Sequence, residues 1–395
     1  MKPTYMGCLV ILLLFLAACT PKAAGPEVET IGDLVFVHNP ALPLQPDLSV
    51  DFEEELEFGG GETDAEAMLY QPSDILIDAR GFFHVSDYRD AVIKVYDQDG
   101  RYVRTIGRKG EGPGEFQSLL DMKFLGDGRL LVLDLRARRS SLFSPTGQFL
   151  ESHPWRNSHF QILFVDDAGY LCDENLYGGD SKVLVTKFDF KGNELENWGE
   201  FTPVGFQMKR IGDSMLSITT PQTPHSIFAG DPARRRLYHC LNDAYLIEVY
   251  APPGKLVRKI DRPYQPVPFT QKDAEEYYAD VDRRKNPQFS EMAREVELPK
   301  VKTVTENMLV DDRGNLWVAT NELDERGEES RRAWDIFNSD GHYLTRLWLT
   351  INPGIFVEGK MYRLHSDEET GFRTVRRYRV TWSDEDDRMG ADLEI

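Results

Sequence analysis

Short apolar runs alternate with Asp/Gly turns along most of the chain. From Ile75 the sequence reads ILIDARGFFHVSD and then AVIKVYDQDGRYVRTIG, so that each half is two short strands joined by a tight turn. Such a pattern predicts a β-hairpin, and two hairpins in succession predict a four-stranded antiparallel meander. The same order returns at Met122, Ile162, Ile227 and Met308, and in shortened form from Ile355 to Trp382.

Six such units at roughly 50 residues each match the blades of a β-propeller and exceed the period of leucine-rich or ankyrin repeats. A sandwich also supplies many strands, but it does not repeat this order of strand, turn and loop. The sequence therefore predicts an all-β, six-bladed β-propeller with four-stranded antiparallel blades. The strands around Leu34 to Val37 are expected to complete the last blade and close the ring, although they could instead belong to a seventh blade.

The stretch from Ile75 to Phe116, which ends RTIGRKGEGPGEF, resembles NHL-type repeats, and the whole pattern is similar to bacterial six-bladed β-propeller lipoproteins with such repeats. The resemblance implies the fold but no particular activity, because this architecture hosts many roles. In the resembled repeat an aspartate pairs with an arginine five residues later, which here matches Asp134 with Arg139. That pair could hold two blades in register or contact a ligand.

One segment departs from the strand pattern, at residues 270–298. Thr270 followed by Asp273 reads as a capping box, and Asn286 followed by Pro287 reads as the start of a second helix. We expect a helical hairpin inserted between two blades. It could be a packing elaboration of the rim, a lid or a partner-docking element.

The N-terminal segment has the features of a bacterial lipoprotein signal. Lys2 precedes an apolar run from Leu9 to Leu16 that is too short to span a membrane, and Leu16, Ala17, Ala18 and Cys19 resemble a lipobox. We therefore expect a signal peptide at 1–18, a lipidated tether at 19–30 beginning with Cys19, the propeller at 31–382 and an acidic tail at 383–395. An ordinary signal peptide with an incidental cysteine is the alternative. Thr20 favours the outer over the inner membrane, by a sorting rule of diderm bacteria.

A net charge of −20 argues against nucleic acid and anionic lipid surfaces as partners, since both require a basic face. Cys172 and Cys240 are expected to be buried thiols, although a disulfide between them is chemically allowed. We therefore expect the protein to contact the membrane through its lipid alone. We expect a monomer whose partner is a protein segment or a glycan.

Propellers bind ligands at the mouth of the central channel, which is built from the loops after each second strand and from the loops between blades. The Asp/Gly turns lie on the opposite face. The candidate binding residues at the mouth are Asp87, Arg89, Asp134, Arg139, Asn175, Asn242, Asp243, Asn321 and Glu322.

No catalytic motif such as GxSxG or HExxH is present. Six-bladed lactonases hold calcium with oxygen ligands from inner strands, but the inner strands expected here are mostly apolar. The sequence thus favours a binding or scaffolding module that needs no cofactor. A lactonase-like or lyase-like enzyme, calcium-dependent in the lactonase case, is the alternative.

Overall fold

The computed structural model describes residues 25–384 apart from 62–64, 156–157, 177–180, 204–206, 212–213, 219–220, 284, 324–330 and 368–370. Side chains are not described at 158, 175 and 204–220 either. Cys19 and the signal segment lie outside the described residues.

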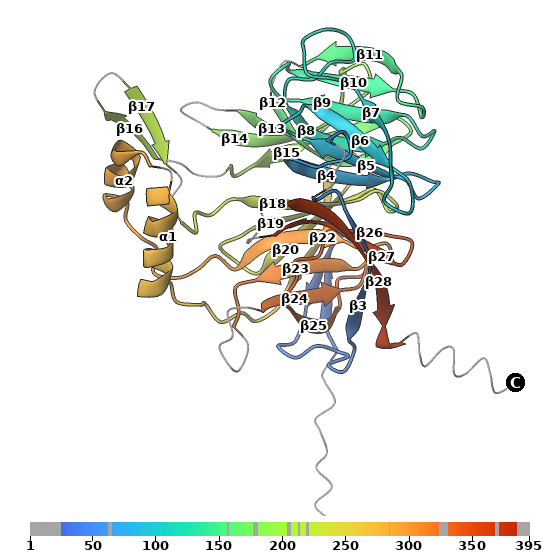
Figure 1. Cartoon of the computed structure of the whole chain (residues 1–395). Coiled ribbons are helices and arrows are strands. Elements are labelled where there is room, and N and C mark those ends of the chain that lie inside the picture. The colour runs from blue at the N-terminus through green and yellow to red at the C-terminus, as the bar shows by residue number, and fades with distance from the viewer. Residues whose placement is uncertain are drawn as a thin grey trace, which may run out of the picture.

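The described strands form six blades arranged as a ring (Figure 1). The first blade is β4 (Pro72–Ile77), β5 (Phe83–Asp87), β6 (Val92–Tyr96) and β7 (Tyr102–Ile106). The second is β8 (Leu119–Phe124), β9 (Leu130–Asp134), β10 (Arg139–Phe143) and β11 (Phe149–Pro154). The third is β12 (Ser158–Asp166), β13 (Gly169–Leu176), β14 (Lys182–Phe188) and β15 (Glu194–Phe201).

The fourth blade is β18 (Ser226–Asp231), β19 (Arg236–Leu241), β20 (Leu246–Ala251) and β21 (Lys255–Asp261). The fifth is β22 (Thr305–Val310), β23 (Leu316–Thr320), β24 (Arg332–Phe337) and β25 (Tyr343–Leu349). The sixth is β26 (Ile355–Val357), β27 (Lys360–Ser366) and β28 (Arg373–Trp382), completed by β3 (Val50–Phe58). The predicted six-bladed β-propeller is confirmed.

The ring is closed by an N-terminal strand, but not by the predicted one. β3 pairs antiparallel with β28, whereas β2 (Leu34–His38) runs parallel to β21 at the edge of the fourth blade. β1 (Glu27–Ile31) then pairs with β2 and makes that sheet six-stranded, so residues 27–30 of the expected tether form part of a strand. The closure has a charge basis, because acidic β3 lies against basic β28. Its ion pairs include Arg379 with Glu53 at 3.0 Å and Arg377 with Glu55 at 3.1 Å.

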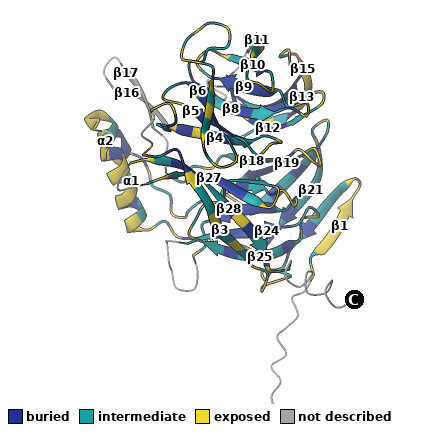
Figure 2. Cartoon of the chain, turned by 45° about the vertical axis from the view of Figure 1, so that its right-hand side comes forward, coloured by how far each residue is buried: buried dark blue, intermediate teal, exposed yellow. Residues whose placement is uncertain are grey.

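The core lies between neighbouring blades. In the first two blades, for example, Ile93 and Val95 pack with Leu130 and Val132 in one buried cluster. Figure 2 shows the blade interiors buried and strand β1 exposed. Each Å² of apolar surface that is buried at such a boundary contributes roughly 25 cal/mol to the stability of the ring.

A small lobe stands beside the ring, at the left of Figure 1. It contains the two predicted helices, α1 (Gln271–Arg283) and α2 (Pro287–Arg294), and a hairpin not predicted from the sequence, β16 (Gln207–Ile211) with β17 (Ser214–Ile218). Asn286 caps α2 by accepting a hydrogen bond from the Phe289 amide at 3.2 Å. The lobe has its own small core around Val281, Met292, Ala293 and Val296.

Candidate functional site

A polar recess lies between the ring and the lobe, on the face where second strands end. Its cavity measures about 400 Å³. Helix α1 forms one wall and the ends of β22 and β23 form another. The residues lining it are Gln222, Asp273, Glu276, Lys302, Glu306, Thr320, Asn321, Glu322, Leu323, Arg331 and Arg332. Of the predicted mouth residues, Asn321 and Glu322 are brought together here.

The walls of this mouth recess are held in place by hydrogen bonds. Lys302 Nζ lies 2.6 Å from an Asp273 carboxylate oxygen, which ties the start of α1 to the ring. The capping box is confirmed, since the Thr270 amide donates to Asp273 at 2.7 Å. Across the recess Asn321 Nδ2 donates to the Thr303 carbonyl at 2.8 Å, and the Thr303 amide donates to Gln222 at 2.7 Å. A ligand would therefore meet a preformed surface.

Glu322 also belongs to a buried ionic network between the fourth and fifth blades. It accepts hydrogen bonds from Arg262 and Arg346, and both guanidiniums also bind the fully buried Asp335. Burial alone would raise the pKa of Asp335, but the Arg262 and Arg346 charges hold it below its usual value. One function of Glu322 is thus to complete this network at the recess floor.

Other predicted mouth residues form hydrogen bonds with backbone amides. Asp87 and Asp134 are fully buried, and their carboxylates accept hydrogen bonds from loop amides, such as that of Tyr70 at 2.7 Å and that of Gln117 at 2.8 Å. Asn242 accepts similarly from the His225 amide at 2.8 Å. These three side chains fix the inter-blade loops.

The expected pairing of Asp134 with Arg139 is wrong. Although the two residues are register partners, Arg139 donates to the carbonyls of Glu111, Gly112 and Glu115 at 2.7–3.2 Å. The two side chains therefore hold the same Gly-rich loop from opposite ends. That loop joins the first two blades, as its flanking strands predicted.

The remaining candidates lie apart from the recess. The Arg89 guanidinium stacks over the Tyr70 ring at 4.4 Å, and Asp243 is exposed at the end of β19. Asn175 pairs with Val183 through β13 and β14, and its side chain lies outside the described ones.

Carboxylates that sequence reasoning missed lie on the inner strands. Asp74 of β4 accepts from the Met122 amide of the second blade at 3.3 Å, and Asp121 of β8 accepts from the Ile162 amide of the third at 2.6 Å. Lys123 lies between them, 2.7 Å from Asp121 and 3.9 Å from Asp74. The repeat itself carried the signal, because SDILI and LDMKF place an aspartate at equivalent positions.

Burial raises the pKa of Asp74 to about 7; Lys123 lowers it in part and Asp121 raises it further. Burial likewise raises the pKa of Asp173, on β13, to about 6. Asp74 also lines a cavity of about 340 Å³ between the first and sixth blades, together with Ser73, Tyr362 and Arg363. A carboxyl group that titrates near neutral pH beside a cavity is a candidate for proton transfer.

Among the described residues, no group of three or more His, Cys, Asp or Glu side chains is placed to hold a metal ion. Within the same part of the chain, no helix is long and apolar enough to cross a membrane. Cys172 and Cys240 are free and buried, as predicted.

The family described as 6-bladed beta-propeller matches residues 51–198, which include β3 and the first two blades. No curated protein matches the chain.

The chain is similar to several solved structures. A DUF4221 family member from Bacteroides vulgatus superposes with a TM-score of 0.50 at 9% identity, covering 85% of this chain and 99% of that one. A Bacteroides fragilis protein described as exported has a TM-score of 0.48 at 12% identity, covering 88% and 99% of the two chains. A gluconolactonase from Xanthomonas campestris has a TM-score of 0.41 at 12% identity, covering 91% and 96%. These likenesses concern the fold alone.

Proposed function

We propose that this propeller is a lipid-anchored, extracytoplasmic binding module whose mouth recess takes a charged segment of a partner protein. The observation that carries the proposal is the mouth recess, where charges of both signs face a preformed cavity. Glu276 lies on the α1 wall, and Lys302, Arg331 and Arg332 lie on the ring side. Such an arrangement complements a polypeptide carrying both acidic and basic side chains.

A protein segment fits this recess better than a glycan. None of the described residues lining it is aromatic. Aromatic rings supply large contact surfaces with a polar edge, and the described lining therefore lacks the ring faces on which a sugar stacks. Charged groups provide most of the available contacts, so the salt dependence of binding should be strong.

The anchor proposed for this module is the lipid on Cys19. The lipobox-like sequence supports it, and dual or triple acylation gives the stable attachment that one chain lacks. The residue after the cysteine, Thr20, supports the outer membrane as the destination.

Site-specific photo-crosslinking in cells tests the recess. A benzoylphenylalanine placed at Leu323, which is 46% exposed at the recess, should yield a protein adduct that is absent at Leu195, which is 48% exposed on β15. The identified partner is then purified and titrated against variants. Glu276→Lys should weaken binding at least tenfold, whereas Glu291→Lys on α2 should not. Equal adducts at both positions, or equal effects of both substitutions, would refute the proposal.

A second candidate function is supported by Asp74, whose raised pKa and adjoining cavity suit a general acid or base in a lactonase-like or lyase-like enzyme. Turnover of a lactone panel, lost in Asp74→Asn but kept in the turn variant Asp78→Asn, would establish it. If calorimetry detects calcium binding, and substitution of acidic residues at the mouth abolishes that binding, the enzyme would be of the calcium-dependent kind. If neither lactone turnover nor calcium binding is measured, the enzyme hypothesis is rejected and the binding module remains.

A further inference from the structure

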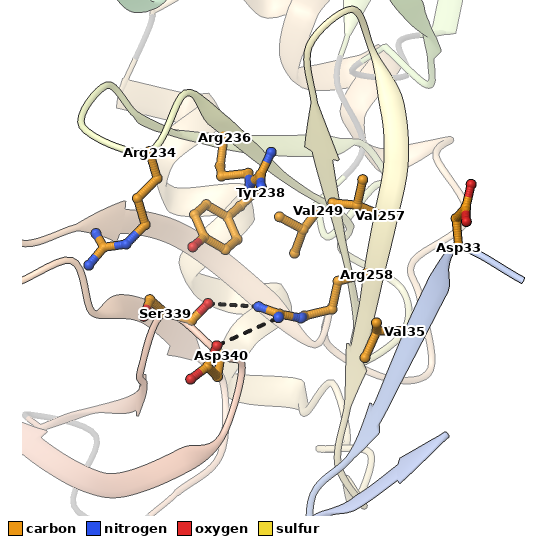
Figure 3. A pocket seen from close by; sticks show the side chains of 10 residues that line it. All are labelled: Asp33, Val35, Arg234, Arg236, Tyr238, Val249, Val257, Arg258, Ser339 and Asp340. Atoms are coloured by element: carbon orange, nitrogen blue, oxygen red, sulfur yellow. Dashed lines mark hydrogen bonds and ion pairs between the residues drawn. The ribbon is translucent and has the colours of Figure 1, made fainter. Parts of the chain in front are cut away.

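A second, larger cavity lies on the face opposite the mouth recess. It measures about 560 Å³ and is bounded by the β18–β19 turn, the β24–β25 turn, strand β21 and the β1–β2 turn. Arg234, Arg236 and Arg258 line it together with Tyr238 (Figure 3). These guanidinium groups gather at one cavity although the chain as a whole carries a net charge of −20.

The arginines of this basic cavity are not fully paired. Arg258 donates to the Ser339 carbonyl at 2.7 Å and lies 3.7 Å from an Asp340 oxygen, as Figure 3 shows, but its Nε is buried without an acceptor. The side chain of Arg236 has no hydrogen-bond or ion-pair partner among the described residues, although its backbone is paired in the β18–β19 ladder. Arg236 therefore offers unpaired donors to a ligand, whereas Arg258 contributes its charge and keeps a buried Nε without an acceptor, which costs free energy.

The acidic residues in the wall do not cancel this charge. Asp33 is 81% exposed and is already bound to Lys255 at 2.6 Å, and Asp340 is 69% exposed at the rim. Arg234 keeps one carboxylate neighbour, Asp231, at 3.2 Å. The interior of the cavity thus retains excess positive charge, and an anion is the ligand that relieves it.

Part of the wall is apolar. Val35, Val249 and Val257 line the cavity alongside the ring of Tyr238. The volume lies in the range of pockets that hold small organic molecules, and it exceeds what a bare inorganic anion fills. A ligand with both an anionic group and an apolar body would use both kinds of surface.

We propose that the basic cavity binds a small organic anion, with a phosphate or carboxylate group on Arg236 and Arg258 and an apolar body against Tyr238 and the valines. The guanidinium fork matches the oxygens of either group, and such charge-assisted hydrogen bonds are the strong ones. This site is independent of the mouth recess and of the partner proposed for it.

Calorimetry on the full-length chain with four probes tests the proposal: phenyl phosphate, benzoate, inorganic phosphate and phenol. Phenyl phosphate or benzoate should bind saturably, and at least tenfold more tightly than inorganic phosphate or phenol. If no probe binds, or if inorganic phosphate binds as tightly as phenyl phosphate, the proposed class of ligand is wrong.

Matched substitutions locate the binding. Arg236→Gln should weaken the tightest probe at least tenfold, whereas Arg129→Gln, at the corresponding turn of the second blade and already paired with Asp127 at 2.7 Å, should leave it unchanged. Circular dichroism confirms that each variant is folded. Equal affinities of the two variants would overturn the assignment.

Vesicles distinguish a free ligand from a lipid head group. The Cys19→Ala chain, which lacks the proposed lipid, is used for this assay. Its sedimentation with phosphatidylglycerol vesicles in a manner that depends on Arg236, in the absence of phenyl phosphate binding, would assign the cavity to a membrane lipid and overturn the small-molecule proposal. Binding of phenyl phosphate without sedimentation would support it.

Discussion

Asp335 lies at the centre of the ionic network at the boundary between the fourth and fifth blades. Its carboxylate is fully buried and accepts from Arg262 at 2.6 and 2.8 Å and from Arg346 at 2.7 and 3.2 Å. The hydroxyls of Tyr245 and Tyr343 donate to it at 2.7 and 3.0 Å. Replacing it with asparagine keeps the shape but removes the charge that the buried Arg262 and the half-buried Arg346 share.

The expected cost of Asp335→Asn is about 3–5 kcal/mol, the usual effect of removing one partner of a buried ion pair. That is a large share of the roughly 5–15 kcal/mol that stabilises most folded domains. Because the folded-state pKa of Asp335 lies below the unfolded value, its contribution is complete at neutral pH and is lost as the pH falls through the folded-state pKa. The difference between variant and native protein should therefore be largest near pH 7 and shrink in acid.

Urea unfolding at pH 7, followed by the fluorescence of the buried Trp317 and Trp334, measures this cost. With a urea dependence of about 3 kcal/mol per molar, the midpoint should fall by about 1 M or more. Asp340→Asn is the matched control, since Asp340 is 69% exposed and should change stability by less than about 1 kcal/mol. A midpoint for Asp335→Asn no lower than that of the control would refute the reasoning.

Four further substitutions give distinct readouts. The folded-state pKa of Asp74 is raised to about 7, so the native protein should lose stability as the pH rises from about 4 to 7. Asp74→Asn should flatten that dependence and be the more stable form at pH 8, as urea midpoints at pH 5 and 8 will show. Asn286→Ala removes the cap of α2 and should cost about 1 kcal/mol, seen as faster amide exchange in the lobe but not in the ring. Gly230→Ala would place a Cβ 1.8 Å from a carbonyl of the third blade and should lower the urea midpoint far more than Gly126→Ala, whose nearest contact is at 3.7 Å. Cys19→Ala should abolish labelling by radioactive palmitate and yield a soluble or uncleaved protein, and labelled variant protein would contradict the proposed anchor.

The blades could be predicted because their determinants are local. Alternating apolar residues and Asp/Gly turns specify each hairpin within about a dozen residues, and the repeat then specifies the ring. The closing strand could not be predicted in this way, because β3 and β28 are distant in sequence. The two strands carry opposite charges, with the sequences VDFEEELEF and RTVRRYRVTW, and this complementarity was a signal for their pairing. The prediction that Leu34 to Val37 complete the last blade did not take it into account.

The candidate site was less accessible to sequence reasoning. An aspartate at the end of a second strand can contact a ligand or bind loop amides, and burial decides between these roles. Asp87 and Asp134 are fully buried and bind amides, whereas Asn321 lines the mouth recess. The inner-strand residue Asp74 was passed over because the neighbouring positions are apolar.

The departures from a regular ring are concentrated around the fourth and fifth blades. The helical insertion lies between them in sequence, and the β1–β2 hairpin extends the fourth. The basic cavity involves residues of both blades, whereas the mouth recess is lined by the fifth blade, the helical insertion and the segment before β18. The family match at residues 51–198, by contrast, ends before the fourth blade begins. A ring needs only repeated packing to close, so additions gathered around the fourth blade are better explained by binding than by stability. The network around Asp335 fits this view, because it joins the two blades rigidly between a recess on one face and a cavity on the other.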